Sequence, residues 1–169
     1  MLNAAVDERY ALAALALAIV MAGVVGAALV FEHGLGYVPC ALCLLQREPY
    51  YAGAPVALIA AAGAALRWPA CVARGGLIIV GLLMAYGALL SAYHAGVEWG
   101  WWAGPADCAT SSTAGVVTDA DNLLGAIDAI KPPSCDEAAL RVLGLSFAGW
   151  NVLVSIVLAY SAFKVATRD

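Results

Sequence analysis

Charged side chains are scarce in this chain of 169 residues. Only 12% of the residues are Asp, Glu, Lys or Arg, whereas 64% are hydrophobic and the mean hydropathy is +0.88. A soluble domain carries roughly 25% charged residues, so this shortage excludes a water-soluble globule and a disordered chain. Basic residues are the scarcer sign, with eight against twelve acidic ones and a net charge of −4. That balance also excludes a nucleic-acid-binding protein, and the composition indicates a small integral membrane protein.

Long uncharged stretches hold most of the apolar residues. A helix that spans a bilayer needs about 20 mostly apolar residues. Four stretches reach or approach this length, namely 10–31, 49–66, 75–93 and 142–163. They are rich in Ala and Gly, which lets membrane helices pack closely. The sequence therefore predicts an all-α integral membrane protein, a four-helix transmembrane bundle that forms one membrane domain over residues 1–169.

The distribution of Lys and Arg predicts the orientation of these spans. With four spans both termini share one side, which holds five basic residues against three on the other. The five are Arg9, Arg67, Arg74, Lys164 and Arg168, and the three are Arg47, Lys131 and Arg141. We therefore expect both termini in the cytoplasm and two outer loops, about 32–48 and 95–141. The first stretch is expected to be a retained span, because its apolar run is longer than that of a signal peptide.

The second outer loop carries most of the acidity. Residues 95–141 hold seven acids and two bases, a net charge of −5. Three tryptophans near its start are typical of the membrane interface; they are Trp99, Trp101 and Trp102. Further along, apolar residues recur at helical spacing from Leu123 to Ile130. This pattern predicts a short amphipathic helix on the membrane surface.

The cysteines divide between the two sides of the membrane. Four of them fall in the outer loops, where disulfides persist, and Cys71 lies alone in the cytoplasmic turn; the four are Cys40, Cys43, Cys108 and Cys135. Four outer cysteines often form structural disulfides only. The spacing Cys40-Ala41-Leu42-Cys43, however, is a CxxC pair, which favours redox exchange over an inert crosslink. Zinc binding is the competing interpretation of two cysteine pairs.

Arg47 follows the CxxC pair by one helical turn. It is a candidate to stabilise a thiolate on Cys43 and to hold the polar head of a ligand, although an arginine at the membrane interface is equally common. A c-type haem is excluded, because Leu44 rather than His follows Cys43. A dithiol at the lipid boundary, without a flavin or haem motif, favours a lipid-soluble electron acceptor such as a quinone.

Several motifs together resemble the disulfide bond formation protein B (DsbB) family. The first is Pro39-Cys40-Ala41-Leu42-Cys43 followed by Gln46-Arg47, and the second is the pair Cys108 and Cys135, 27 positions apart. Tyr93-His94-Ala95 and the segment from Leu143 to Ser146 with Trp150 also match. The resemblance covers nearly the whole chain.

The resemblance implies an enzyme, a protein-disulfide:quinone oxidoreductase of the bacterial inner membrane. It would reoxidise a periplasmic thioredoxin-like thiol oxidase of the DsbA type and reduce ubiquinone or menaquinone from the membrane pool. Cys108 would form the mixed disulfide with the partner, and Cys135 would exchange with Cys40. Cys43 would face the quinone as the thiolate. Arg47 would support that thiolate, and His94 is a candidate to flank the quinone head group.

Two other hypotheses stay open at this point. A vitamin K epoxide reductase-like enzyme is also a four-helix quinone-using protein with a CxxC pair, but there the loop cysteines precede the CxxC, whereas here they follow it. A metal-binding membrane protein would use Cys40, Cys43, His33 and His94 as ligands. A zinc analysis would separate this interpretation from the redox enzyme, for which we expect no metal.

Overall fold

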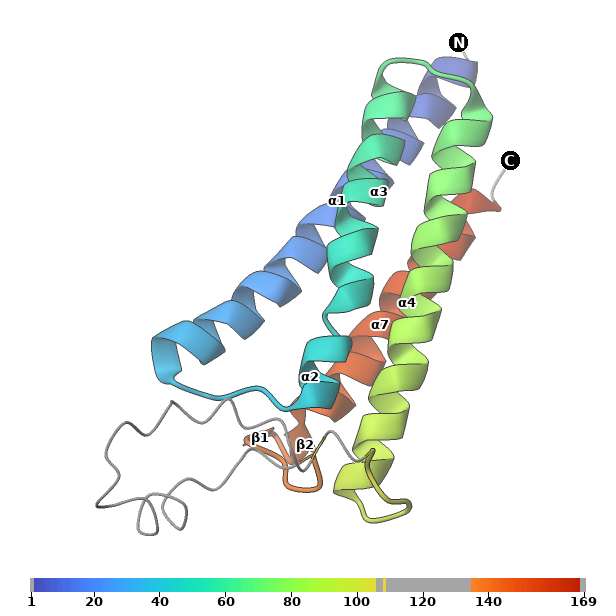
Figure 1. The fold of residues 1–169 in the computed structure, drawn as a ribbon. Helices are drawn as coiled ribbons and strands as arrows, with labels where there is room; N and C mark the ends of the chain where they lie inside the picture. The colour runs from blue at the N-terminus through green and yellow to red at the C-terminus, as the bar shows by residue number, and fades with distance from the viewer. Residues whose placement is uncertain (1, 106–107, 109–134, 168–169) are drawn as a thin grey trace, which may run out of the picture.

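A computed structural model describes residues 2–105, 108 and 135–167 of the chain, and these residues are mostly helical (Figure 1). The long helices are α1 (Leu2–Leu29), α3 (Glu48–Ala65), α4 (Ala70–Glu98) and α7 (Phe147–Ala166). A π-helical turn, η1 (Val30–Gly34), continues α1, and the short helix α2 (Ala41–Leu45) precedes α3. Two short strands, β1 (Arg141–Val142) and β2 (Leu145–Ser146), pair antiparallel just before α7. The predicted surface helix around 123–130 lies outside the described residues.

Three of the helical segments are long and apolar enough to cross a membrane: Glu8–Gly34, Ala70–Glu98 and Phe147–Ala166. They correspond to the first, third and fourth predicted spans. Helix α3 corresponds to the second, and its first turn contains Glu48, Pro49 and two tyrosines. Pro49 is tolerated there because the first amide groups of a helix have no partner within the helix.

Two differences between the predicted spans and the structure affect the site. Helix α4 continues to Glu98 rather than ending at 93, so Glu98 belongs to a helix and not to the outer loop. Helix α7 begins at Phe147 rather than at 142, because the preceding residues form the β1–β2 hairpin. Its turn requires positive φ at Leu143 and Gly144, which is incompatible with a helix. Ser146 then caps α7 by accepting a hydrogen bond from the amide of Gly149.

Small residues allow the four long helices to pack closely. Helix α3 packs between α1 and α4, and α4 also packs along α7. Their buried contacts are mostly alanine, with Met21, Leu77 and Met84 filling the centre. Large apolar side chains such as Leu12 and Leu89 point outward. An interior of small residues beneath an apolar exterior is the arrangement expected for helices that meet in lipid.

We expect Gly76→Ala to destabilise the bundle and Gly75→Ala to leave it intact. A Cβ on Gly76 would lie 2.8 Å from the Cβ of Ala60, whereas a Cβ on Gly75 would meet nothing within 4 Å. Overpacking of this kind costs about 1–3 kcal/mol, while alanine at an open helical position is favourable by up to about 1 kcal/mol. Thermal unfolding in detergent measures both variants, and equal midpoints would contradict the predicted contact.

The two ends of the bundle differ in character. Both termini and the α3–α4 turn lie at one end, and α2 and the β1–β2 hairpin lie at the other (Figure 1). Cys71, the second residue of α4, is therefore near the terminal end, and it is exposed. The other four cysteines lie toward the α2 end, which leaves Cys71 separate from them.

Candidate active site

Helix α2 positions the CxxC pair. Cys40 is the N-cap of this helix, and its Sγ accepts a hydrogen bond from the backbone amide of Cys43 at 3.3 Å. One helical turn brings the two side chains together, so their sulfur atoms lie 2.8 Å apart and share a hydrogen bond. Cys40 is buried and Cys43 is half-buried, and both are free thiols. The pair is therefore present as a hydrogen-bonded dithiol.

The two thiols of this pair have different pKa values. The pKa of Cys40 is lowered from its ordinary value of 9.0 to about 4, mainly by the hydrogen bond with Cys43 and also by His94. The pKa of Cys43 is raised, because its hydrogen bond to Cys40 and its burial both favour the protonated form. The resemblance implies a thiolate on Cys43 facing a quinone. In this dithiol the contacts with Cys43 and His94 instead lower the pKa of Cys40.

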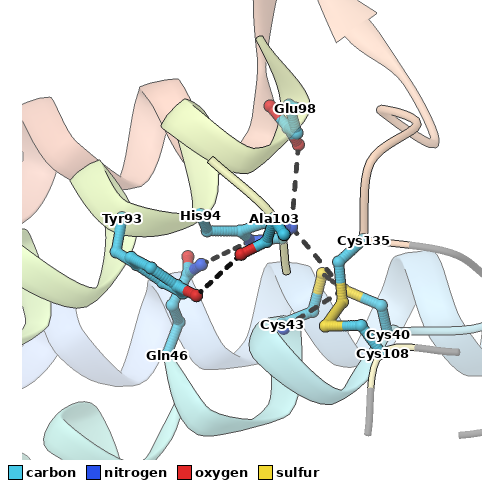
Figure 2. The surroundings of a disulfide bond; sticks show 9 residues. All are labelled: Cys40, Cys43, Gln46, Tyr93, His94, Glu98, Ala103, Cys108 and Cys135. Carbon is cyan, nitrogen blue, oxygen red and sulfur yellow. Dashed lines mark hydrogen bonds and ion pairs between the residues drawn. A yellow bond between two sulfur atoms is a disulfide. The ribbon is translucent and has the colours of Figure 1, made fainter. Parts of the chain in front are cut away.

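The second cysteine pair forms a disulfide beside the first. Cys108 and Cys135 are bonded to each other and are both buried. They pack in one apolar cluster with Cys40, Leu42 and Val97, and Cys43 contacts this cluster. Figure 2 shows the disulfide beside the CxxC pair. The fold therefore brings all four predicted redox cysteines together, although the whole of α3 and α4 separates the two pairs along the chain. Sulfur atoms packed in this way are suited to thiol–disulfide exchange.

His94 is the basic side chain that contacts the CxxC pair. Its Nε2 lies 3.7 Å from Cys40 Sγ and 3.9 Å from Glu98 Oε1. Its Nδ1 lies 2.6 Å from the side-chain nitrogen Nε2 of Gln46. The imidazole is thus held between a thiol, a carboxylate and an amide, as Figure 2 shows. The sequence predicted His94 as a candidate for the head group of a ligand, and the structure additionally places it against Cys40.

A buried network of polar side chains extends from His94 between α3, α4 and α7. The side-chain oxygen of Gln46 accepts hydrogen bonds from Asn151 Nδ2 at 3.0 Å and from Ser91 Oγ at 3.3 Å. Asn151 Oδ1 accepts from the Tyr50 hydroxyl at 2.5 Å, and that hydroxyl also bonds to Ser155 Oγ at 2.8 Å. Sequence reasoning assigned no role to these five residues or to Glu98. The available signal was a set of polar side chains inside otherwise apolar runs.

Arg47 forms an ion pair with a carboxylate. Its guanidinium donates to Glu32 Oε2 at 2.5 Å, and the two side chains are largely buried. Glu32 is on the π-helical turn η1, a type of distortion that is frequent at functional sites. The sequence predicted that Arg47 would support a Cys43 thiolate. In the structure its hydrogen-bond partner is Glu32, and His94 is the basic side chain that lowers the pKa of Cys40.

A cavity of about 600 Å³ opens beside the CxxC pair. Apolar side chains from α1, η1 and α7, among them Phe31 and Phe147, form much of its wall. Its polar lining includes most of the residues described above, namely Glu32, Cys40, Cys43, Gln46, Arg47, Tyr50, His94, Glu98 and Asn151. Mostly apolar walls with a few convergent polar groups are the usual features of a small-molecule site.

The comparison with known families decides the identity of the chain. The family model described as "Disulfide bond formation protein DsbB" matches residues 10–165. The chain belongs to the DsbB family. It is accordingly a membrane thiol oxidoreductase of disulfide bond formation. No curated protein and no solved structure matches it.

This DsbB-family site has a geometry that fits a dithiol better than a metal centre. Among the described residues, the sulfurs of Cys40 and Cys43 and a ring nitrogen of His94 lie within 4.8 Å of one another. Two thiolates around zinc, with bonds of about 2.3 Å, would be roughly 3.7 Å apart. The observed separation of 2.8 Å is shorter than that, so the two sulfur atoms do not have the spacing of a pair of zinc ligands. His33 is not in this group.

Proposed function

We propose that this DsbB-family protein reoxidises a periplasmic thioredoxin-like thiol oxidase of the DsbA type and passes the electrons to a membrane quinone. One observation carries the proposal: the Cys108–Cys135 disulfide packs against Cys40, at a cavity that Cys43 lines. The disulfide would accept electrons from a soluble partner, and the dithiol would pass them to a ligand in the cavity. Together they form the two halves of an electron relay. Neither half alone would connect a soluble donor with a lipid-soluble acceptor.

The relay balances as a series of thiol–disulfide exchanges and one oxidation. A thiolate of the partner attacks Cys108, forming a mixed disulfide and releasing Cys135. Cys135 attacks Cys40 of the oxidised CxxC pair, and Cys43 leaves as a thiol or thiolate. The second thiol of the partner then resolves the mixed disulfide, and the electron pair of its dithiol is left on the protein. To restore both the Cys40–Cys43 and the Cys108–Cys135 disulfide, the protein must pass two electrons and two protons to an acceptor.

The cavity residues fit a quinone as that acceptor. When bound, a quinone accepts two electrons and two protons at its ring oxygens. The apolar wall around Phe31 and Phe147 suits a flat ring with an isoprenoid chain. Arg47 is the cationic donor of the described cavity lining, and it is oriented by Glu32. Cys43 lies in the same lining, so its sulfur is exposed to whatever occupies the cavity.

Glu32→Gln is expected to lower the apparent KM for quinone about tenfold. The Glu32 carboxylate holds the Arg47 guanidinium, and a neutral amide would leave that donor available to a quinone oxygen. A hydrogen bond to a charged group contributes about 1.5–3 kcal/mol. Steady-state kinetics with a soluble quinone analogue measures the change, with the exposed Glu48→Gln as the matched control. An increase in KM in Glu32→Gln would contradict this role of Arg47.

We also propose the membrane arrangement that the relay needs. Helices α1, α3, α4 and α7 would form the four spans of one membrane domain in the bacterial inner membrane. Both termini would be cytoplasmic and the four redox cysteines periplasmic. The position of the termini and of α2 at opposite ends of the bundle supports this orientation (Figure 1). The segment around 123–130 would lie along the membrane surface and link the Cys108–Cys135 disulfide to the partner.

The test of the proposed function is reconstitution from purified components. The protein in detergent, supplied with a reduced thioredoxin-like oxidase, should reduce one ubiquinone or menaquinone analogue for each partner dithiol oxidised. Absorbance of the quinone follows the reaction, and the two analogues identify the preferred acceptor. Partner oxidation without quinone reduction would overturn the proposal. The metal-binding alternative predicts stoichiometric zinc in the same sample, and the vitamin K epoxide reductase-like alternative predicts reduction of an epoxide.

A further inference from the structure

Glu98 is a buried carboxylate with an unused oxygen. It is the last residue of α4, and its side chain is 4% exposed. One oxygen, Oε1, faces His94, and the other, Oε2, has no hydrogen-bond partner among the described residues. Glu98 also lines the cavity that contains Cys43 and Arg47. An unpaired buried carboxylate oxygen is costly, so its position requires an explanation.

The polar network determines which nitrogen of His94 carries the proton. The oxygen of Gln46 accepts from both Asn151 and Ser91, so its NH₂ group must face His94. The Gln46 amide then donates to His94 Nδ1, which must be the unprotonated nitrogen. The ring proton is therefore on Nε2, where it faces Cys40 and Glu98. Gln46 acts as a positioning residue that holds this tautomer.

With this tautomer His94 has no free acceptor for a thiol proton. Its Nδ1 is occupied by Gln46, and its Nε2 already carries hydrogen. If Nδ1 were protonated, its N–H would face the N–H of the Gln46 side chain. The Gln46 amide cannot turn its oxygen toward His94 instead, because it would lose its hydrogen bonds to Asn151 and Ser91. Oxidation of the dithiol must nevertheless release the proton of Cys43. Glu98 Oε2 is a free acceptor for it, in the same cavity lining as Cys43.

We propose that Glu98 is the proton-transfer group of this site, receiving the proton of Cys43 and delivering it to a quinone oxygen in the cavity. The inference rests on the proposed quinone-linked function. In the balanced step the Cys40–Cys43 dithiol loses two electrons and two protons and becomes a disulfide. Glu98 carries the Cys43 proton and returns to its carboxylate form. The other proton has already left Cys40, as its thiolate, and an equivalent one is taken up from water.

The charges around Glu98 are consistent with this role. Its negative charge is one of the causes that raise the pKa of Cys43, so the carboxylate and the thiol proton already interact. The other titratable groups of the cavity lining are Cys40, His94, the Glu32–Arg47 ion pair, Tyr37, Tyr50, and Glu137 on the segment after Cys135. Of these, His94 lies against Glu98, whereas Arg47 is paired with Glu32.

The decisive variant is Glu98→Gln, which keeps the size of the side chain and removes its basicity. We expect kcat to fall about 100-fold, the lower end of what general acid–base catalysis contributes, with the quinone KM changed less than about threefold. In this variant kcat should fall more steeply as the pH rises, since water must then supply the proton to the quinone oxygen. Glu98→Asp should recover part of the rate. Glu48→Gln, an exposed carboxylate outside the cavity lining, should match the unmodified protein.

A measurement without quinone separates proton transfer from a structural role. In the reduced, quinone-free protein, Glu98→Gln should move the ionisation of Cys43 to lower pH, visible in the ultraviolet absorbance of the thiolate. Full kcat with an unchanged pH profile in Glu98→Gln would overturn the inference. If Glu98→Gln unfolds, Glu98→Asp with an unchanged profile would overturn it equally. Absence of quinone reduction in the unmodified protein would instead contradict the proposed function, so the two failures are distinguishable.

Discussion

Replacing Cys43 by alanine is expected to abolish quinone reduction, by a factor of at least about 10³. Cys43 is the CxxC residue whose sulfur is half-buried in the cavity lining, 2.8 Å from Cys40. Without it no Cys40–Cys43 disulfide can form for Cys135 to attack, so electrons from the partner cannot pass through the CxxC pair to the acceptor. Removal of one member of a catalytic unit typically costs as much as loss of the whole unit.

Two controls make this result specific. Cys71→Ala should keep full activity, because Cys71 is exposed at the start of α4, near the end of the bundle opposite α2. Cys43→Ala should still form a mixed disulfide with the partner through the Cys108–Cys135 pair, which gel electrophoresis without reductant detects. Normal turnover of Cys43→Ala would refute the relay, whereas loss of both turnover and mixed disulfide would indicate a folding defect.

Cys40 should remain a thiolate in the reduced protein down to about pH 4. Its pKa is lowered from 9.0 to about 4, and a group with a lowered pKa keeps its charge above that value and loses it as the pH falls through it. At about pH 6 its thiolate fraction should therefore be about a thousandfold larger than that of an ordinary thiol. A titration of the ultraviolet thiolate absorbance, corrected with Cys40→Ala, measures the midpoint.

The same titration tests the cause of the lowered pKa. Cys43→Ala removes the largest contribution, the hydrogen bond between the two sulfurs, and should raise the pKa of Cys40 most. His94→Ala removes the smaller contribution of the imidazole, whose Nε2–H faces Cys40, and should raise it less. A midpoint near 9.0 in the unmodified protein, or the reverse order of the two variants, would contradict the assignment of the thiolate to Cys40.

Membership of the DsbB family was accessible from the sequence because its signals are local. The CxxC pair and the following arginine lie within eight consecutive positions, 40–47, so this motif can be recognised without knowledge of the fold. The long apolar runs likewise identify membrane helices by composition alone. The extension of α4 to Glu98 was not predicted, because Glu98 is a charged residue that hydropathy assigns to a loop, although it lies one helical turn after His94.

The partners of the site residues could not be predicted for a related reason. Arg47 has Glu48 next to it in the chain, yet its partner in the structure is Glu32, because η1 brings that carboxylate back toward α3. Gln46 had no predicted role, since an isolated glutamine carries no recognisable signal. Its function becomes visible only through Asn151 and His94, which lie 105 and 48 positions away along the chain.

The sequence by itself determined that this is an apolar, helical membrane protein with a CxxC pair and a second pair of cysteines. Those properties depend on composition and short spacings, which act over one or two helical turns. Only the tertiary structure decided that the Cys108–Cys135 disulfide packs against Cys40, that the contacts of Cys40 lower its pKa, and that Glu98 has an unpaired oxygen and lines the same cavity. The physical reason is that pKa values and proton acceptors depend on contacts within a few ångströms. In a bundle those contacts come from different helices.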